Sequence, residues 1–200
     1  SHGVECIGSC LLVNTRLAII DLSERGRQPM SNDDHSVWIT YNGESYNAAE
    51  LRRQHEAKGA LFQTTPDTEG ILHLLADPAY ASDADPLAAV LRALRGAYCL
   101  LFIFPDRIEA ARDPQGLRPL CIGKLATGEY VVASETCALD IVDAEFVREV
   151  APGEIVTLNH DGLSSRMFLP ASQVKPAHCI FEHVYFADPS SDIFGQNVHS

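Results

Sequence analysis

The feature that most constrains the fold is a succession of short β-prone runs in the second half of the chain. These apolar and β-branched runs occupy residues 98–104, 108–112, 120–124, 130–134, 146–150, 155–158 and 163–167. Turn formers separate them, including Pro105-Asp106 and Asp161-Gly162. Such close spacing of short strands is typical of antiparallel hairpins. This half of the chain therefore predicts antiparallel sheet.

A strand, a turn and a helix are expected in order from residue 37. The run 37–41 is apolar, aromatic and β-branched, which predicts a buried strand. Asn42-Gly43 predicts a turn because both residues tolerate positive φ, and the missing Cβ lets a ligand approach the backbone. Asn47 is the expected N-cap of a helix that carries Glu50 in its first turn and stops at Gly59. The end of this strand is thus expected to present the side-chain amide of Asn42 next to the Gly43 backbone, which no side chain shields.

A carboxylate follows at the start of the next helix. Residues 61–64 predict a second strand, which leads to Asp67 and to a helix over 68–76. An acid is favoured at that position because the first turn of a helix has free amide donors. Taken from the residues alone, Asn42-Gly43 and Asp67 could equally be an ordinary turn and an ordinary helix cap.

A third helix is expected after a loop. Residues 77–85 are rich in Pro, Ala, Ser and Asp, which predicts an exposed loop. Asp85-Pro86 predicts an N-cap with its first-turn proline, and Gly96 predicts the helix end. The apolar positions between them follow the helical period and predict a core-facing stripe: Leu87, Val90, Leu91 and Leu94. Helices beside many short strands indicate an α+β layered domain.

Composition narrows the functional classes. The 200 residues, 46% apolar and 21% charged, suit one globular domain. There is no apolar run of about eighteen residues and no signal-peptide pattern, so a cytoplasmic chain is predicted. The net charge of −12 argues against binding to nucleic acid or to an anionic membrane.

The cysteines and histidines give no metal-site pattern. The six cysteines form no CxxC pair, and the eight histidines show no metal-binding spacing, so no metal is expected in this chain. Cys99, Cys121 and Cys137 lie in apolar surroundings, where free cysteines are usually small buried hydrophobes. Cys6 and Cys10 are expected to be strand residues.

Arg16 is the first candidate for a substrate contact. Its guanidinium fork can bind a carboxylate bidentately, which suits the α-carboxylate of an amino acid. The alternative from the residues alone is a surface arginine at a strand end.

Four motifs that include these candidates occur in order in the first half. They are Arg16-Leu-Ala-Ile-Ile-Asp-Leu-Ser, Gln28-Pro29-Met30, Tyr41-Asn42-Gly43-Glu44 and Thr64-Thr65-Pro66-Asp67-Thr68-Glu69. The set resembles the glutaminase domain of class II glutamine amidotransferases, and the first motif leans towards the asparagine synthetase group.

The second half sharpens the resemblance. Residues 112–120, 133–138 and 152–156 resemble the later glutaminase domain of the glutamine phosphoribosylpyrophosphate amidotransferase (amidophosphoribosyltransferase) family. Residues 179–191 and 197–200 resemble the segment by which that enzyme leaves its glutaminase domain and enters its phosphoribosyltransferase domain. Asp188 departs from the arginine usual there. The resemblance implies a glutaminase domain over 1–178, and over 179–200 the start of a connection to a phosphoribosyltransferase domain.

The resemblance also implies a fold and a mechanism. The fold is the N-terminal-nucleophile αββα sandwich of two antiparallel sheets. An N-terminal cysteine with its own α-amino group as base attacks the glutamine amide, and the released ammonia serves purine nucleotide synthesis in a second domain. Asn42 and Gly43 would donate to the oxyanion, Arg16 would bind the substrate carboxylate, and Asp67 would bind its α-ammonium.

Partners and cofactors follow from the same resemblance. The parent enzyme is expected to be a homo-oligomer, and no cofactor is expected in this chain. Mg²⁺ and an iron–sulfur cluster stay open for the parent, since Cys179 stands where some relatives place one cluster ligand, but one cysteine does not decide it.

The start of the chain departs from the family pattern. Residue one is Ser1 rather than cysteine, and only fifteen residues precede Arg16. We therefore expect a chain that lacks the usual N-terminus and is inactive as given. Two alternatives are an asparagine-synthetase-like glutaminase domain and a non-catalytic glutamine-binding or scaffold domain of the same fold. Arg112, Asp113, Ser134 and Glu135 are expected to be turn and framework residues.

Overall fold

The computed structural model describes residues 2–15, 26–64 and 67–199. The chain forms two compact units. Unit 1 comprises residues 1–96 and 100–109, and unit 2 comprises residues 97–99 and 110–200. Each unit is described by itself.

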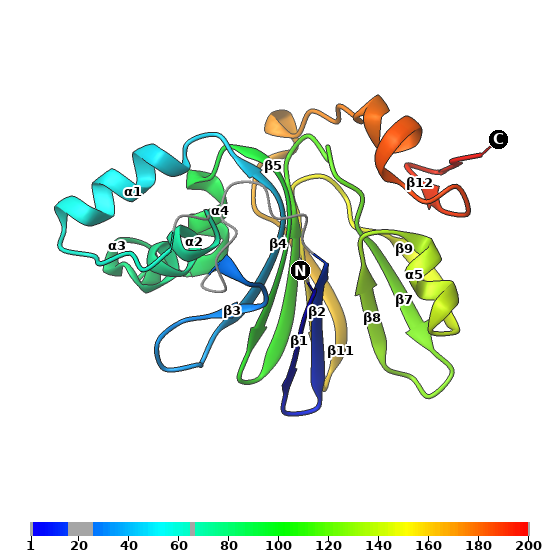
Figure 1. Cartoon of the computed structure of the whole chain (residues 1–200), viewed down its shortest axis with the longest axis horizontal. Helices are drawn as coiled ribbons and strands as arrows, with labels where there is room; N and C mark the ends of the chain where they lie inside the picture. The colour runs from blue at the N-terminus through cyan, green and yellow to red at the C-terminus, as the bar shows by residue number, and fades with distance from the viewer. Residues whose placement is uncertain (1, 16–25, 65–66, 200) are drawn as a thin grey trace. The chain divides into compact units, whose positions relative to one another are not determined.

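Unit 1 combines helices with a sheet. In Figure 1 the helices gather on one side of β4 (Trp38–Ser45). They are α1 (Ala48–Ala57), α2 (Asp67–Ala76), α3 (Pro78–Ala81) and α4 (Pro86–Ala93). The predicted apolar stripe of α4 is buried, with Val90 and Leu91 at most 1% exposed. The Asp85 side chain caps α4 by accepting a hydrogen bond from the Ala88 amide at 3.1 Å, as predicted.

The strands of unit 1 form a hairpin and part of a larger sheet. β1 (His2–Ile7) and β2 (Cys10–Thr15) pair antiparallel, which confirms Cys6 and Cys10 as strand residues. The larger sheet has the order β6-β5-β4-β3 in this unit, with β3 (Met30–Ser31), β5 (Gly96–Phe104) and β6 (Arg107–Arg112). β5 and β6 contribute residues to both units.

Unit 2 is mainly antiparallel strand. β7 (Cys121–Leu125) lies between β8 (Tyr130–Ala133) and β9 (Ala144–Glu149), while β10 (Glu154–Asn159) lies between β6 and β11 (Gly162–Met167). α5 (Thr136–Ile141) lies beside β7 and β9 (Figure 1). Its Leu139 belongs to one buried apolar cluster with Cys121 and Ala144. A 3₁₀ turn (Ala171–Gln173), a π-helix (Glu182–Phe186) and a hairpin of β12 (Asp192–Ile193) and β13 (Gln196–Asn197) complete the unit.

The α+β class and every strand predicted between residues 98 and 167 are confirmed as β5 to β11. Three local predictions are wrong. β4 runs through Asn42-Gly43 to Ser45, so this pair is not a turn. Residues 61–64 form no strand. The predicted loop over 77–85 contains α3, because the Asp77 side chain accepts a hydrogen bond from the Ala79 amide and a proline occupies the first turn.

Two boundary residues have roles other than those predicted. Gly96 does not end α4, which stops at Ala93, but begins β5. A Cβ at Gly96 would lie 2.1 Å from the Glu44 carbonyl oxygen, so glycine lets β5 approach β4 closely. Asn47 does precede α1, but its side chain makes no cap bond. It instead donates to the Ala93 carbonyl and accepts from the Arg95 amide, both at 2.9 Å.

Candidate functional site

The candidate site lies in unit 1 where the end of β4 meets the start of α2. Asn42 is exposed and Gly43 is half-buried on β4, and Gly43 has a φ of 153°, a value that glycine adopts without strain. The Ser45 amide donates to Asp67 Oδ2 at 2.9 Å. This bond attaches the acid of α2 to the strand that carries Asn42 and Gly43. Arg16 lies outside the described residues.

The electrostatics of the site depend on two carboxylates. Burial raises the pKa of Asp67, and the hydrogen bond from Ser45 offsets part of that shift. Partial desolvation of the otherwise exposed Glu44 raises its pKa, and the charge of Asp67 raises it further. Because burial disfavours the charge of Asp67, and burial together with the charge of Asp67 disfavours that of Glu44, a cation beside them would favour the ionised form of both.

Glu44 was not singled out from the sequence, although it belongs to one of the quoted motifs. An acid directly after Asn42-Gly43, at the end of the strand that meets Asp67, is the signal that could have identified it. The effect of Asp67 on the pKa of Glu44 depends on the approach of α2 to β4, and a local sequence pattern does not predict that tertiary contact.

A cavity of about 180 Å³ lies beside Asp67. Its lining is mostly apolar and comprises Ser45, Ala48, Ala49, Leu51, Arg52, Phe62, Asp67, Gly70, Ile71, Leu74 and Leu94. Asn42 and Gly43 do not line it. Such walls offer few partners for the side-chain amide of glutamine. The predicted cleft shared by Arg16, Asn42, Gly43 and Asp67 stays a prediction.

The approach to α2 is organised by Glu69. Its carboxylate accepts hydrogen bonds from the Gln63 and Thr64 amides, at 2.6 and 2.7 Å, and from the Thr64 hydroxyl at 2.6 Å. These two amides therefore bind a side chain rather than a neighbouring strand, which explains why the predicted strand is absent. Arg52 also holds this segment, with Nη1 donating to the Thr64 carbonyl at 2.7 Å.

In unit 2 the expected framework residues include a buried arginine. Arg112 is 1% exposed and donates to the Arg118, Gly116 and Val150 carbonyls and to the Glu149 carboxylate. Asp113 accepts from the Tyr98, Gln115 and Leu117 amides. Burial raises the pKa of Asp113, and these amides partly offset the shift. The framework role of both residues is confirmed.

The remaining framework and cysteine predictions have mixed outcomes. Glu135 accepts from the Asp188 amide and the Ser191 hydroxyl, which confirms its framework role, whereas that of Ser134 stays a prediction. Cys99 and Cys121 are buried as predicted, whereas Cys137, expected to be buried like them, is only half-buried. Burial raises the pKa of Cys99 and Cys121, that of Cys121 to about 12. A thiol with so high a pKa is not a ready nucleophile.

Within residues 2–15, 26–64 and 67–199, no three His, Cys, Asp or Glu residues are grouped so that they could hold a metal ion. No helix in the same ranges is long and apolar enough to cross a membrane.

Comparisons with known proteins connect this chain with a family. A family model for the glutamine amidotransferase domain matches residues 1–191. The amidophosphoribosyltransferase of Bacillus subtilis is 41% identical over 170 residues, which cover 85% of this chain and 35% of that protein. Chloroplastic amidophosphoribosyltransferase 1 of Arabidopsis thaliana is also 41% identical, over 82% of this chain and 29% of its own length. The chain thus spans about a third of the curated relatives it matches.

A solved structure agrees with these sequence matches. The glutamine phosphoribosylpyrophosphate amidotransferase from B. subtilis, complexed with ADP and GMP, superposes with a TM-score of 0.86 at 38% identity. The match covers 95% of this chain and 41% of that one. The antiparallel sheets and helices described above therefore have the N-terminal-nucleophile hydrolase fold. The chain belongs to the glutamine amidotransferase domain family.

Proposed function

We propose that this chain is the glutaminase domain of an amidophosphoribosyltransferase-like enzyme. The domain would release ammonia from glutamine and pass it to a phosphoribosyltransferase domain for purine nucleotide synthesis. Family membership and the names of the relatives support this proposal. The observation that carries it is the hydrogen bond between the Ser45 amide and Asp67, which joins the Asn42-Gly43 strand to an acid with a raised pKa.

Each site residue has one role in the proposed reaction. Asp67, with Glu44 beside it, binds the α-ammonium of glutamine, and the cation favours the ionised form of both acids. Arg16 binds the α-carboxylate through its guanidinium fork. The Asn42 side chain and the Gly43 amide donate to the oxyanion that forms when the amide carbon is attacked. The nucleophile is a cysteine at the start of the mature chain, so the test uses the complete gene product.

The decisive variant is Asn42→Ala in that complete protein. If the Asn42 amide stabilises the oxyanion, kcat for ammonia release falls by on the order of 10²–10³-fold while KM for glutamine changes little. A suitable control is Asn159→Ala, since Asn159 is exposed in β10 and its side chain accepts a hydrogen bond from the nearby Asp161 amide. Unchanged kcat in Asn42→Ala would remove Asn42 from that role. Glutamine binding without any ammonia release by the unaltered protein would favour the non-catalytic alternative.

Other properties of the complete protein stay predictions. They are its homo-oligomeric state, its Mg²⁺ or iron–sulfur cofactors, and its cytoplasmic location. The plant relatives carry the word chloroplastic in their names, so the compartment is best measured by fractionation. The boundary between residues 178 and 179 is also a prediction.

A further inference from the structure

We infer that Gln28 is a positioning residue whose buried side-chain amide holds the oxyanion-donor strand in register with the ammonium-binding helix. This inference rests on the proposed function, because it assigns Gln28 an effect through Asn42 and Asp67. Neither the family motif nor the local pattern gives Gln28 this task.

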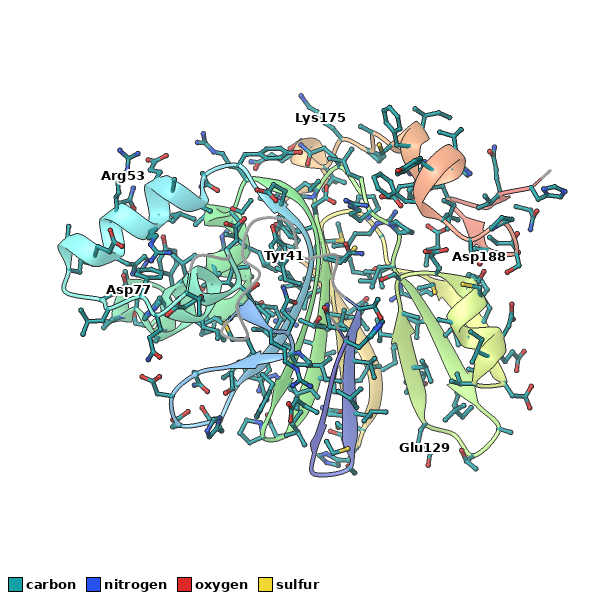
Figure 2. All side chains as sticks on the ribbon, viewed as in Figure 1. Tyr41, Arg53, Asp77, Glu129, Lys175 and Asp188 are labelled. Carbon is teal, nitrogen blue, oxygen red and sulfur yellow. The ribbon has the colours of Figure 1, made fainter. Side chains whose placement is uncertain are left out.

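The geometry of Gln28 connects β4 with α2. Its Oε1 accepts from the Tyr41 amide at 2.6 Å, and its Nε2 donates to Thr68 Oγ1 at 3.1 Å. Tyr41 directly precedes Asn42, and Thr68 directly follows Asp67. Figure 2 labels Tyr41 on β4, at the strand side of this connection. One side chain thus links the neighbours of two proposed substrate contacts.

The hydrogen-bond donors fix the orientation of this amide. A backbone N–H can only donate, so the Gln28 atom that faces Tyr41 must be the carbonyl oxygen, and the NH₂ group must face Thr68. Thr40 Oγ1 donates to the same oxygen at 3.3 Å. Asn14 Nδ2 donates to Thr40 Oγ1 at 2.5 Å and approaches Gln28 Oε1 at 3.4 Å. A side chain at position 28 can bond both the Tyr41 amide and Thr68 Oγ1 only if it has the length of glutamine and carries an acceptor and a donor at its tip.

Burial makes these hydrogen bonds consequential. Gln28 is 6% exposed, and Thr68 is fully buried. Unpaired polar groups in such a place have no water to replace a lost partner. The connection is therefore stiffer than an exposed contact of equal length.

The Gln28 connection and the Asp67 contact together enclose the oxyanion-donor segment. Before the segment 42–44, the Tyr41 amide is tied through Gln28 to Thr68. After the segment, the Ser45 amide is tied directly to Asp67. Both attachments end on the first two residues of α2. A shift of α2 along β4 would have to break both, so Gln28 sets the separation of the oxyanion donors from the ammonium acceptor.

The test compares Gln28→Met and Thr68→Val in the complete protein. Methionine has nearly the length of glutamine but forms neither hydrogen bond, so β4 loses the bond at Tyr41 and α2 loses the bond at Thr68. We expect kcat to fall and KM for glutamine to rise, with kcat/KM lower by on the order of 10²-fold. Thr68→Val removes the hydrogen bond between Gln28 and α2 but keeps the one between Gln28 and the Tyr41 amide. We therefore expect KM alone to rise, by up to about tenfold. Thr68→Val decides the inference if Gln28→Met fails to fold.

Thr157→Val is the matched control. Thr157 is 9% exposed in β10 and accepts from Arg166 Nη1 at 2.9 Å, so this change also removes the hydroxyl of a buried threonine from a side-chain hydrogen bond, here a part-buried one. It should lower Tm as Thr68→Val does and leave kcat and KM unchanged. If Thr68→Val and Gln28→Met behave like this control, the role of Gln28 is purely structural and the inference is overturned.

A double variant separates the inference from the proposed function. Asp67→Asn should raise KM for glutamine, and adding Gln28→Met should raise KM no further if Gln28 acts on KM through Asp67. Additive effects on KM would overturn the inference while the function stands. If Asp67→Asn and Asn42→Ala both leave the kinetics unchanged, the proposed function fails and the inference fails with it.

Discussion

At the scale of single residues, the acid that suits the proposed reaction opposes the stability of the fold. Asp67 is half-buried, and its pKa is raised from the usual 3.8 because of that burial. The folded state therefore holds the carboxyl proton more tightly than the unfolded state does. Stability from this group is full at low pH, decreases as pH rises through 3.8 to the raised pKa, and stays lower above it.

We accordingly expect Asp67→Asn to stabilise the domain near neutral pH. Asparagine keeps an acceptor for the Ser45 amide and removes the buried charge, so the free energy of unfolding should rise by about 0.5–2 kcal/mol. The gain should vanish below the usual pKa of an aspartate, where Asp67 is neutral in both states. Urea unfolding of both proteins at neutral and acidic pH measures this difference. An equal gain at both pH values would mean that the charge of Asp67 is not its source.

At this scale, sequence motifs identify candidate site residues but do not predict which side chains contact one another in the fold. Asp67 and Asn42-Gly43 were identified and lie at one junction, whereas Gln28 and the coupling of Glu44 to Asp67 were missed. The Gln28 contacts reach across to Tyr41 and Thr68, which are distant in sequence. No local pattern encodes which buried amide will meet which strand.

At the scale of elements, two glycines should respond oppositely to alanine. Gly96→Ala places a Cβ 2.1 Å from the Glu44 carbonyl, so β5 must move away from β4, at a cost of about 1–3 kcal/mol. Gly70 lies inside α2, and a Cβ there meets Phe62 at an ordinary 3.9 Å. Gly70→Ala should therefore stabilise the domain by about 0.5–1 kcal/mol through the higher helix propensity of alanine. Thermal unfolding compares the two variants, and equal shifts would contradict the backbone contact at Gly96.

The elements themselves were predictable where periodicity was regular. The strands β5 to β11 follow short apolar and β-branched runs separated by turn formers, and the buried stripe of α4 follows the helical period. Residues 61–64 do not form the predicted strand, because the Gln63 and Thr64 amides donate to the Glu69 carboxylate. The end of α4 was also misplaced, since the need for Gly96 comes from β4 and not from the helix.

At the scale of the whole molecule, the acidic balance governs solubility. The chain has a net charge of −12 and a pI of about 5.0. Repulsion between molecules is weakest near the pI, so we expect a solubility minimum of the 200-residue polypeptide near pH 5.0 that moderate salt relieves. Turbidity measured across pH tests this. A minimum well away from the pI would indicate association through exposed apolar surface instead.

The α+β class was predictable because helices occur early and short strands late in the chain. The division into two units was not, since β5 and β6 contribute to both and no composition change marks them.

The side chain of Arg112 has a consequence for how its loop can evolve. Three of its four acceptors are main-chain carbonyls, at Gly116, Arg118 and Val150. Such acceptors are present whatever side chains the loop 113–119 carries, so mutation of its exposed Gln115 leaves the Arg112 bonds in place. The backbone path itself requires Asp113, which accepts from two loop amides, and Gly116, where a Cβ would lie 2.6 Å from Pro152. We therefore expect the exposed side chains of this loop to diverge among descendants of this gene while Asp113, Gly116 and the backbone path persist. The loop could then acquire new surface chemistry without first losing its shape.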